Sequence, residues 1–120
     1  MPQLSVRSLE RLKDVHPDLI RVCVLALAYS DLDFGITEGL RTLERQEQLV
    51  AEGKSWTFHS KHLSGRAVDI VAYVDGKVSW EFSCYKTIAN AFYKAAKDLG
   101  VSIEWGGEWK QKDGVHFQLD

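Results

Sequence analysis

The sequence predicts an α+β domain in which a small antiparallel sheet is flanked by helices. Strand-like stretches begin at Phe34, Ala67, Ile103 and His116, and the helices expected between them differ in length. Of the 120 residues, 45% are hydrophobic and 27% are charged, as in ordinary soluble globular proteins. A chain of this length buries enough surface for one core, so we expect residues 1–120 to form a single domain without a separate binding module.

The first half of the chain is predicted to contain three helices and one strand. Their bounds follow from capping residues, proline positions and apolar periodicity. In chain order we expect a helix over residues 8–12, a helix from Pro17 to about Tyr29, a strand over residues 34–40 and a polar helix over residues 42–52. Ser8 is the expected N-cap of the first helix, and Gly53 is the expected stop of the last. Leu43 and Val50 should share the apolar side of this last helix.

The second half is predicted to contain a hairpin, one long helix and two further strands. Asp75-Gly76 is a strong tight-turn signal between two strand patterns. In chain order we expect a strand over residues 67–74, a short return strand beginning at Lys77, a helix from about Cys84 to Leu99, a strand over residues 101–105 and a strand opening at His116. Gly100 should cap the long helix, whose apolar stripe indicates a core-packing face.

Charge and hydropathy exclude several classes of protein. The formal net charge of −2 and the pI near 6.1, with basic residues dispersed among acidic ones, give no electrostatic footprint for nucleic acid. No apolar stretch is long enough for a signal peptide core or a bilayer span, so we expect synthesis in a cytoplasm and no membrane segment. Cys23 and Cys84 lie in apolar helical patterns without metal-site spacing, and we expect free buried thiols. We expect a monomer.

Asp69 is the first candidate functional residue, because it interrupts an otherwise apolar strand. An unpaired buried carboxylate is costly, so Asp69 needs a cation, a hydrogen-bond cage or a metal ion as partner. His62 precedes it beyond a glycine that permits a tight turn, and His116 opens the last strand. Two histidines and one carboxylate are a common zinc set that leaves one position open for water. The sequence therefore predicts a zinc site formed by His62, Asp69 and His116.

Hydrolysis at such a site also requires a base close to the water. Asp113 lies three residues before His116, so a turn between them can bring its carboxylate beside the metal without making it a ligand. Glu108 is the main rival for this role. His59, three residues before His62, is an alternative metal ligand, and its other interpretation is a groove or surface residue.

The chain contains the pattern Ser60-x-His62-x-x-Gly65-x-Ala67-x-Asp69, followed late by Asp113-x-x-His116. It also contains Glu38-Gly39-Leu40-Arg41-Thr42 with Gln46 shortly after, and Trp105-Gly106-Gly107-Glu108-Trp109. In order and spacing these motifs resemble the zinc D-Ala-D-Ala carboxypeptidase and L-alanyl-D-glutamate endopeptidase family, and its small phage endolysins most closely. The resemblance covers roughly residues 34–119.

The resemblance implies a fold and a set of roles. The fold would be the VanY-like fold shared with the Hedgehog signalling domain, and the whole chain would be one peptidase domain without a cell-wall-binding domain. Arg41 would stabilise the substrate carbonyl as it becomes an oxyanion, which suits a side chain that stays charged. Ser60, Gln46 and Trp105 would contact substrate. Without the resemblance, Ser60 fits a loop serine, Gln46 a solvated glutamine and Trp105 an aromatic residue of the core or its rim. Trp109 also fits either the core or the rim.

The resemblance further implies zinc-dependent cleavage of bacterial peptidoglycan between L-Ala and D-Glu of the stem peptide, after a holin has released the protein from the host cytoplasm. Two other functions remain open. One is a D,D- or L,D-carboxypeptidase, although many relatives of that kind carry glutamate where this chain has Asp113. The other is a zinc-stabilised binding module without turnover, which the joint presence of Asp113 and Arg41 disfavours.

Overall fold

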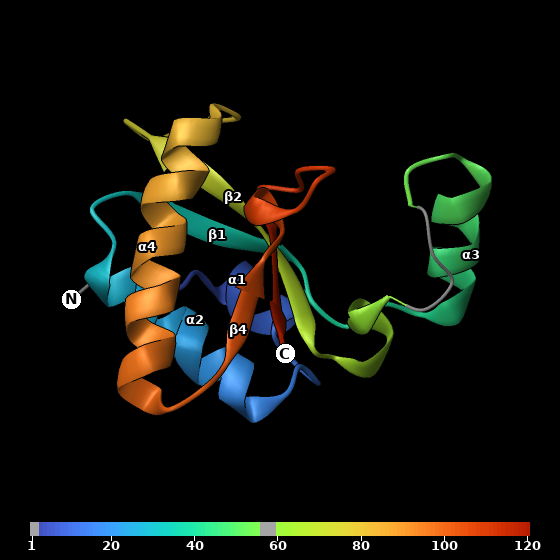
Figure 1. The fold of residues 1–120 in the computed structure, drawn as a ribbon, viewed down its shortest axis with the longest axis horizontal. Helices are drawn as coiled ribbons and strands as arrows, with labels where there is room; N and C mark the ends of the chain where they lie inside the picture. The colour runs from blue at the N-terminus through green and yellow to red at the C-terminus, as the bar shows by residue number, and fades with distance from the viewer. Residues whose placement is uncertain (1–2, 56–59) are drawn as a thin grey trace.

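The computed structural model describes residues 3–55 and 60–120 and confirms a mixed helical and antiparallel architecture (Figure 1). The helices are α1 Val6–Arg11, α2 Pro17–Tyr29, α3 Leu43–Ala51 and α4 Phe82–Leu99, with short 3-10 helices η1 Lys61–Ser64 and η2 Gly106–Glu108. The strands are β1 Asp33–Glu38, β2 Ala67–Val74, β3 Lys77–Ser79, β4 Ile103–Trp105 and β5 His116–Leu119. No helix in the described ranges has both the length and the apolar character needed to cross a membrane.

The sheet is organised around β2. Its strand order is β1-β2-β5-β4 with antiparallel neighbours, and β3 pairs with the far end of β2. Asp69 on β2 is paired with Glu38 of β1 on one side and with His116 of β5 on the other. The pairing of these three strands thus brings residues from distant parts of the sequence to one place in the sheet.

The core lies between the sheet and the two long helices, α2 and α4 (Figure 1). In β2, Val68, Ile70 and Ala72 are buried in this core, as the alternating pattern predicted. Phe92 of α4 stacks on Phe117 of β5 with ring centroids 3.9 Å apart. The face of β5 opposite Phe117 carries His116, so packing of the core also fixes the position of a candidate ligand.

Helix α1 begins earlier than predicted. Its N-cap is Ser5, whose side chain accepts a hydrogen bond from the backbone N–H of Ser8. Ser8 is buried, and its hydroxyl accepts the backbone N–H of Ile36 at 2.9 Å. Arg11 donates to the carbonyl of the same residue at 2.9 Å. The prediction of Ser8 as N-cap was therefore wrong, because its hydroxyl is used at the outer edge of β1.

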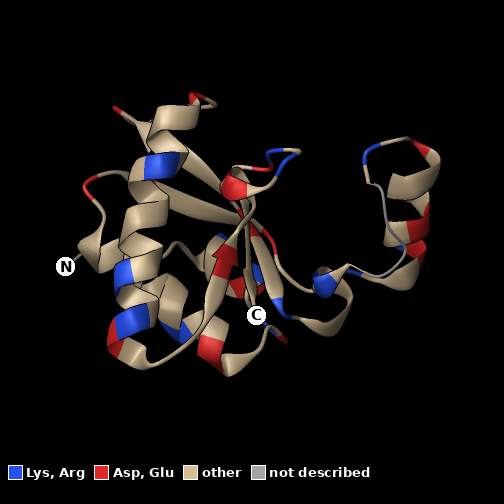
Figure 2. Cartoon of the chain, in the orientation of Figure 1, with Lys and Arg blue, Asp and Glu red and all other residues tan. Residues whose placement is uncertain are grey.

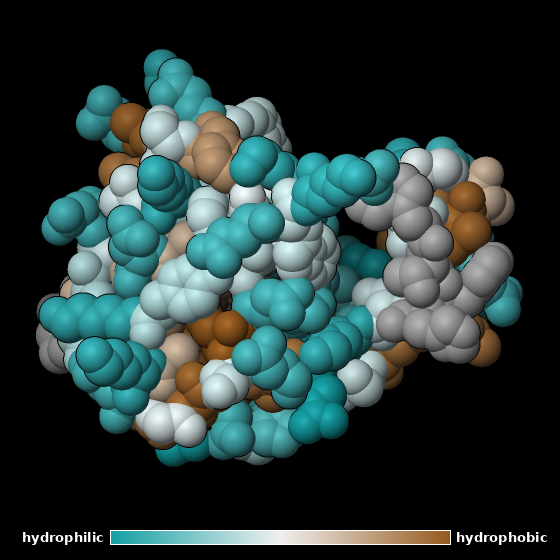
Figure 3. Space-filling model, in the orientation of Figure 1, coloured by the Kyte–Doolittle hydropathy of each residue, from teal (hydrophilic) through white to brown (hydrophobic). Residues whose placement is uncertain are grey.

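Helix α3 stands apart from the rest of the domain (Figure 1), and this face of the molecule is hollowed between the two (Figure 3). Its buried residues are Gln46 and Leu49, whereas Leu43 is 58% exposed. The expected apolar side with Leu43 and Val50 was therefore wrong. Thr42 is the N-cap of α3, and Gly53 follows its end with φ of +73°. Acidic and basic residues are interspersed over the ribbon in this view (Figure 2).

The remaining bounds differ from the predictions by a few residues. Strand β1 ends at Glu38 because its register with β2 shifts there, so it does not reach Leu40. Helix α4 starts at Phe82 rather than Cys84, and β4 starts at Ile103 rather than Val101. The Asp75-Gly76 turn and the Gly100 cap were predicted correctly, as were the two buried free cysteines.

Candidate metal centre

Three side chains converge where η1, β2 and β5 meet. His62, Asp69 and His116, hereafter the triad, each offer one ligand atom, and these atoms lie within 4.8 Å of one another. Oδ1 of Asp69 lies 3.2 Å from Nε2 of His62 and 3.1 Å from Nδ1 of His116. Two imidazoles and one carboxylate form a donor set that suits Zn²⁺. The triad therefore fits a metal ion on its chemistry and its spacing.

Each histidine presents a different ring nitrogen to Asp69. Nδ1 of His62 donates to the carbonyl of Gly39 at 2.8 Å, which leaves Nε2 facing Asp69. His116 has the opposite arrangement, because its Nε2 donates to Oε1 of Gln118 at 2.9 Å and its Nδ1 faces Asp69. A fixed outer hydrogen bond of this kind orients a histidine for metal binding.

Local backbone geometry places His62. The side chain of Ser60 caps η1 by accepting the backbone N–H of His62, and Gly65 ends η1 with φ of +70°. A side chain at Gly65 would also approach the carbonyl oxygen of Asp14 to 2.6 Å. Glycine is thus needed for the turn that carries the chain from His62 into β2.

Burial and charge act in opposition on the pKa of Asp69. Burial raises it, but hydrogen bonds from His116 and His62, together with their charges, outweigh burial and bring the pKa well below its ordinary value. For His116, burial lowers the pKa, while the hydrogen bond to Asp69 and the charge of that carboxylate raise it above its ordinary value overall. In the absence of a metal, hydrogen bonds to the two rings therefore stabilise the Asp69 carboxylate.

Arg41 lies beside the triad, and several contacts fix its guanidinium group. Its Nε donates to Glu38, its Nη1 donates to Oε1 of Gln46 at 2.6 Å, and its Nη2 lies 3.8 Å from Asp69. Its backbone N–H also donates to the carbonyl of His62 at 2.9 Å. With only 8% of its side chain exposed, Arg41 is a fixed positive charge at the wall of the site.

Asp113 lies in the segment between η2 and β5. Its backbone N–H donates to Gly106, and its carbonyl accepts the N–H of His116 at 3.2 Å. A side chain at Gly106 would meet the Asp113 carbonyl at 2.4 Å, so glycine permits this close approach. Burial and the charge of Asp69 raise the pKa of Asp113, as expected for a carboxyl group poised for proton transfer. Its rival Glu108 is exposed on η2.

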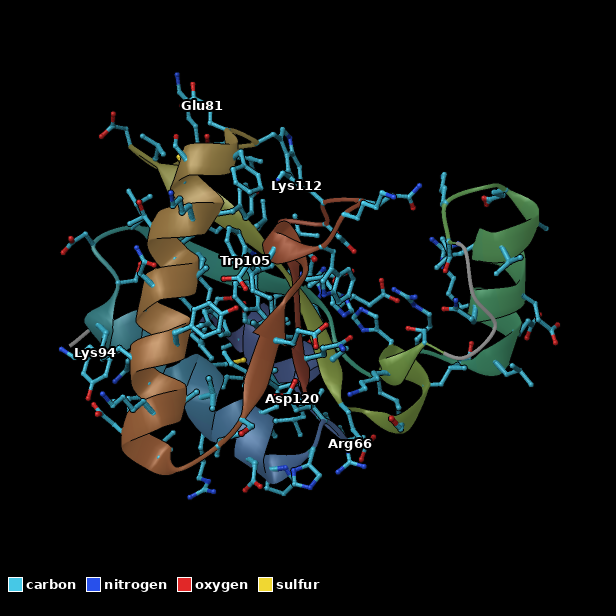
Figure 4. All side chains as sticks on the ribbon, viewed as in Figure 1. Arg66, Glu81, Lys94, Trp105, Lys112 and Asp120 are labelled. Atoms are coloured by element: carbon cyan, nitrogen blue, oxygen red, sulfur yellow. The ribbon has the colours of Figure 1, made fainter. Side chains whose placement is uncertain are left out.

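A cavity of about 450 Å³ connects these groups. Its lining includes the triad, Arg41 and Asp113 as well as Ser60, which was expected to contact substrate. Side chains from the sheet and from η1 project into the space on the α3 side of the domain (Figure 4). His59, the alternative ligand, lies outside the described residues.

Two other residues expected to contact substrate do not line this cavity. Gln46 is fully buried behind Arg41, and its Nε2 donates to Ser55 at 2.8 Å. Trp105 is buried in the core, where Figure 4 labels it, and its indole N–H donates to the Gly114 carbonyl at 2.8 Å. Trp109, by contrast, lines the cavity, and its ring centroid lies 5.2 Å from that of His116.

Sequence reasoning overlooked Gln118, Lys61 and the carbonyl of Gly39. Gln118 lies two residues beyond His116 on β5 and therefore projects from the same face of the sheet, a signal that strand periodicity contains. Lys61 immediately precedes His62 and lines the cavity. The Gly39 carbonyl is a backbone group, so residue identity gave no indication of it.

Several known proteins resemble this chain along most of its length. Residues 1–119 match the model of a family described as phage L-alanyl-D-glutamate peptidase. The L-alanyl-D-glutamate peptidase of Escherichia phage T5 is 33% identical over 92% of this chain and 83% of its own length. The peptidoglycan L-alanyl-D-glutamate endopeptidase CwlK of Bacillus subtilis is 31% identical over 88% of this chain and 74% of its own length.

Solved structures show the same likeness. The crystal structure of the Serratia marcescens L-Ala D-Glu endopeptidase ChiX superposes with a TM-score of 0.94 at 52% identity, covering 99% of this chain and 90% of that one. The D,D-dipeptidase VanXYg shares the fold at 18% identity, with a TM-score of 0.54 over 88% of this chain and 50% of that one.

Proposed function

The chain belongs to the phage L-alanyl-D-glutamate peptidase family, and we propose that it cleaves the bond between L-Ala and D-Glu in the stem peptide of bacterial peptidoglycan. The observation that carries the proposal is that the triad, Asp113 and Arg41 all line one cavity. The triad would hold Zn²⁺, which when bound acidifies water and polarises a carbonyl group.

The residues of the chain divide the remaining work between them. Asp113 accepts a proton from the attacking water and later returns it to the amine of the leaving D-Glu, which its raised pKa favours. Arg41 stabilises the negative charge that develops on the carbonyl oxygen of L-Ala, because its guanidinium is already fixed by Glu38 and Gln46. Ser60 and Trp109 provide polar and aromatic contacts in the same cavity.

Gln46 and Trp105 take supporting roles in this proposal rather than direct contact with substrate. Gln46 links Arg41 to Ser55 and so holds the guanidinium in place. Trp105 supports the segment that carries Asp113 through its hydrogen bond to Gly114. Both roles follow from the positions of these side chains behind the cavity wall.

The proposal is tested by digesting purified peptidoglycan with zinc-loaded protein, with and without a strong chelator. We expect chelator-sensitive release of fragments with a new N-terminal D-Glu, detected by mass spectrometry. Release of terminal D-Ala alone would instead identify a carboxypeptidase. A folded protein that binds one zinc ion and releases nothing would identify a binding module.

Asp113→Asn tests the assigned base. We expect this variant to bind zinc as the wild type does and to lose about 10²–10⁴-fold in rate, since that is the usual contribution of general-base catalysis. The matched control is Glu108→Gln, because Glu108 is an exposed carboxylate on the neighbouring η2. Full activity in Asp113→Asn, or a comparable loss in Glu108→Gln, contradicts the assignment.

Oligomeric state and release from the cell are further parts of the proposal. We propose that the chain acts as a monomer and, as its resemblance to phage endolysins implies, reaches the cell wall after a holin opens the host membrane. Light scattering of the purified protein tests the first point. Expression in a bacterial host with and without a co-expressed holin tests the second, with lysis expected only when both are present.

A further inference from the structure

Among the described residues, three lysine or arginine side chains line the cavity, and two of them are paired with acids. Arg41 contacts Glu38 and lies near Asp69, and Lys54 lies 3.8 Å from Glu52. Within residues 3–55 and 60–120, no carboxylate forms an ion pair with Lys61. Its Nζ donates instead to a neutral acceptor, the carbonyl of Leu119, at 2.5 Å. Lys61 is therefore a cation without an ion-pair partner among the described residues, and it lines the same cavity as the candidate metal centre.

The backbone of Lys61 is fixed while its side chain remains adaptable. Its carbonyl accepts the N–H of Arg66 at 2.9 Å, and the capped η1 helix places it directly before His62. The side chain is partly buried at the cavity wall and ends in a compact ammonium group on a flexible stem. The Leu119 carbonyl uses one of the three N–H donors of that group, which leaves two donors for another acceptor.

The chemistry of the proposed substrate supplies an anion on the residue next to the scissile bond. The scissile bond joins the carbonyl of L-Ala to the amine of D-Glu, and glutamate carries two carboxyl groups, of which only one continues the peptide. The second remains a carboxylate unless it is amidated. It is part of the residue whose amine leaves, so it enters the cavity whenever the bond is in position for cleavage.

We propose that Lys61 binds this second carboxylate and makes the enzyme selective for stem peptides in which it is free. A charge-assisted hydrogen bond to a carboxylate is lost when the group becomes a neutral amide. The amide also presents N–H groups to an ammonium that has only donors, which adds a repulsive contact. The inference rests on the proposed function and names the form of the substrate that the same site prefers.

The test uses two synthetic peptides that differ only at this carboxyl group, one with the free acid and one with the amide. Both have an amidated C-terminus, so that no other carboxylate distinguishes them. We expect zinc-loaded wild-type protein to cleave the acid with a kcat/KM about 10- to 100-fold higher than the amide, the range of one hydrogen bond to a charged group. Lys61→Met should remove most of this preference by slowing the acid while leaving the amide almost unchanged.

The amide peptide also serves as the internal control for folding, because structural damage from losing the Leu119 contact would slow both peptides equally. Lys61→Arg should retain a preference for the acid. Lys54→Met is the matched control, since Lys54 lines the same cavity but already lies near Glu52, and it should keep the wild-type ratio.

Two outcomes would overturn the inference while leaving the peptidase function intact. The first is equal cleavage of both peptides by the wild type, and the second is an undiminished preference in Lys61→Met, whether or not both rates fall. If the wild type cleaves neither peptide nor peptidoglycan, the proposed function fails and the inference fails with it.

Discussion

At the scale of single residues, Asp69 shows how a carboxylate that is costly to bury can form part of a candidate metal site. A carboxylate among apolar strand residues is costly to bury, and Asp69 is stabilised by His62 and His116 on one oxygen and by Arg41 near the other. The sequence indicated that Asp69 needs such partners, and His62 and His116 were correctly predicted as its neighbours. It did not predict how the rings are oriented, because that depends on the Gly39 carbonyl and on Gln118.

The orientation of His116 leads to a prediction for Gln118. Replacement by leucine keeps the size of the side chain but removes the acceptor for Nε2–H, so the ring loses the contact that turns Nδ1 toward Asp69. We expect Gln118→Leu to bind zinc about 10- to 100-fold more weakly, measured by competition with a coloured chelator.

Gln111→Leu is the control for Gln118→Leu, because Gln111 is exposed on the loop before Asp113. Nitrogen chemical shifts of the zinc-loaded protein should identify Nδ1 as the bound atom of His116 in the wild type. Unchanged zinc affinity in Gln118→Leu would contradict the orienting role.

At the scale of elements, prediction from the sequence was most accurate where residues of the same kind occupy both faces of an element. Strand β2 was predicted with its exact bounds because apolar residues occupy both faces and a turn signal ends it. Helix α3 was predicted in position but not in orientation. Its most buried residue, Gln46, is polar and is satisfied by Arg41 and Ser55, which are contacts that apolar periodicity does not encode.

The link between α1 and the site leads to a prediction for Gly39. A side chain there would approach the Arg11 carbonyl to 2.1 Å and a methyl group of Val15 to 2.7 Å, so alanine must displace the chain that presents the Gly39 carbonyl to His62. We expect Gly39→Ala to destabilise the fold by about 1–3 kcal/mol in urea unfolding, the usual cost of overpacking, and to weaken zinc binding.

Gly53→Ala is the control that separates the effect of overpacking at Gly39 from the effect of backbone strain. Gly53 has φ of +73° but no atom within 4 Å of the position of an added side chain, so its replacement costs only the conformational penalty of about 1–2 kcal/mol. Zinc affinity should be unchanged in Gly53→Ala. If Gly39→Ala and Gly53→Ala are equally destabilised and both bind zinc normally, the close approach at Gly39 has no role in the site.

At the scale of the whole molecule, the triad connects η1, β2 and β5, and this produces a dependence of stability on pH. In the metal-free protein the pKa of His116 is raised in the folded state. A group with a raised folded pKa contributes stability that is fully present below its unfolded pKa and is lost as the pH rises through its folded pKa.

We therefore expect the free energy of unfolding of chelator-treated protein to fall as the pH rises above about 6.5, the ordinary value for histidine. The decline should be weaker in Asp69→Asn, which removes the carboxylate responsible for the raised pKa. Zinc should reverse the trend, because its ligands must be deprotonated, and zinc in 100-fold excess over its dissociation constant should add about 2.7 kcal/mol. Urea titrations at several pH values provide the measurement, and identical pH profiles with and without zinc would contradict the expectation.

The contacts of Ser8 and Arg11 with Ile36 have a consequence for behaviour at high concentration. The outermost strand of an open sheet carries unused amide and carbonyl groups that can recruit a strand from a neighbouring molecule. Here the short first helix occupies both backbone groups of Ile36 on that border. The two side chains that attach α1 to β1 therefore also oppose edge-to-edge aggregation.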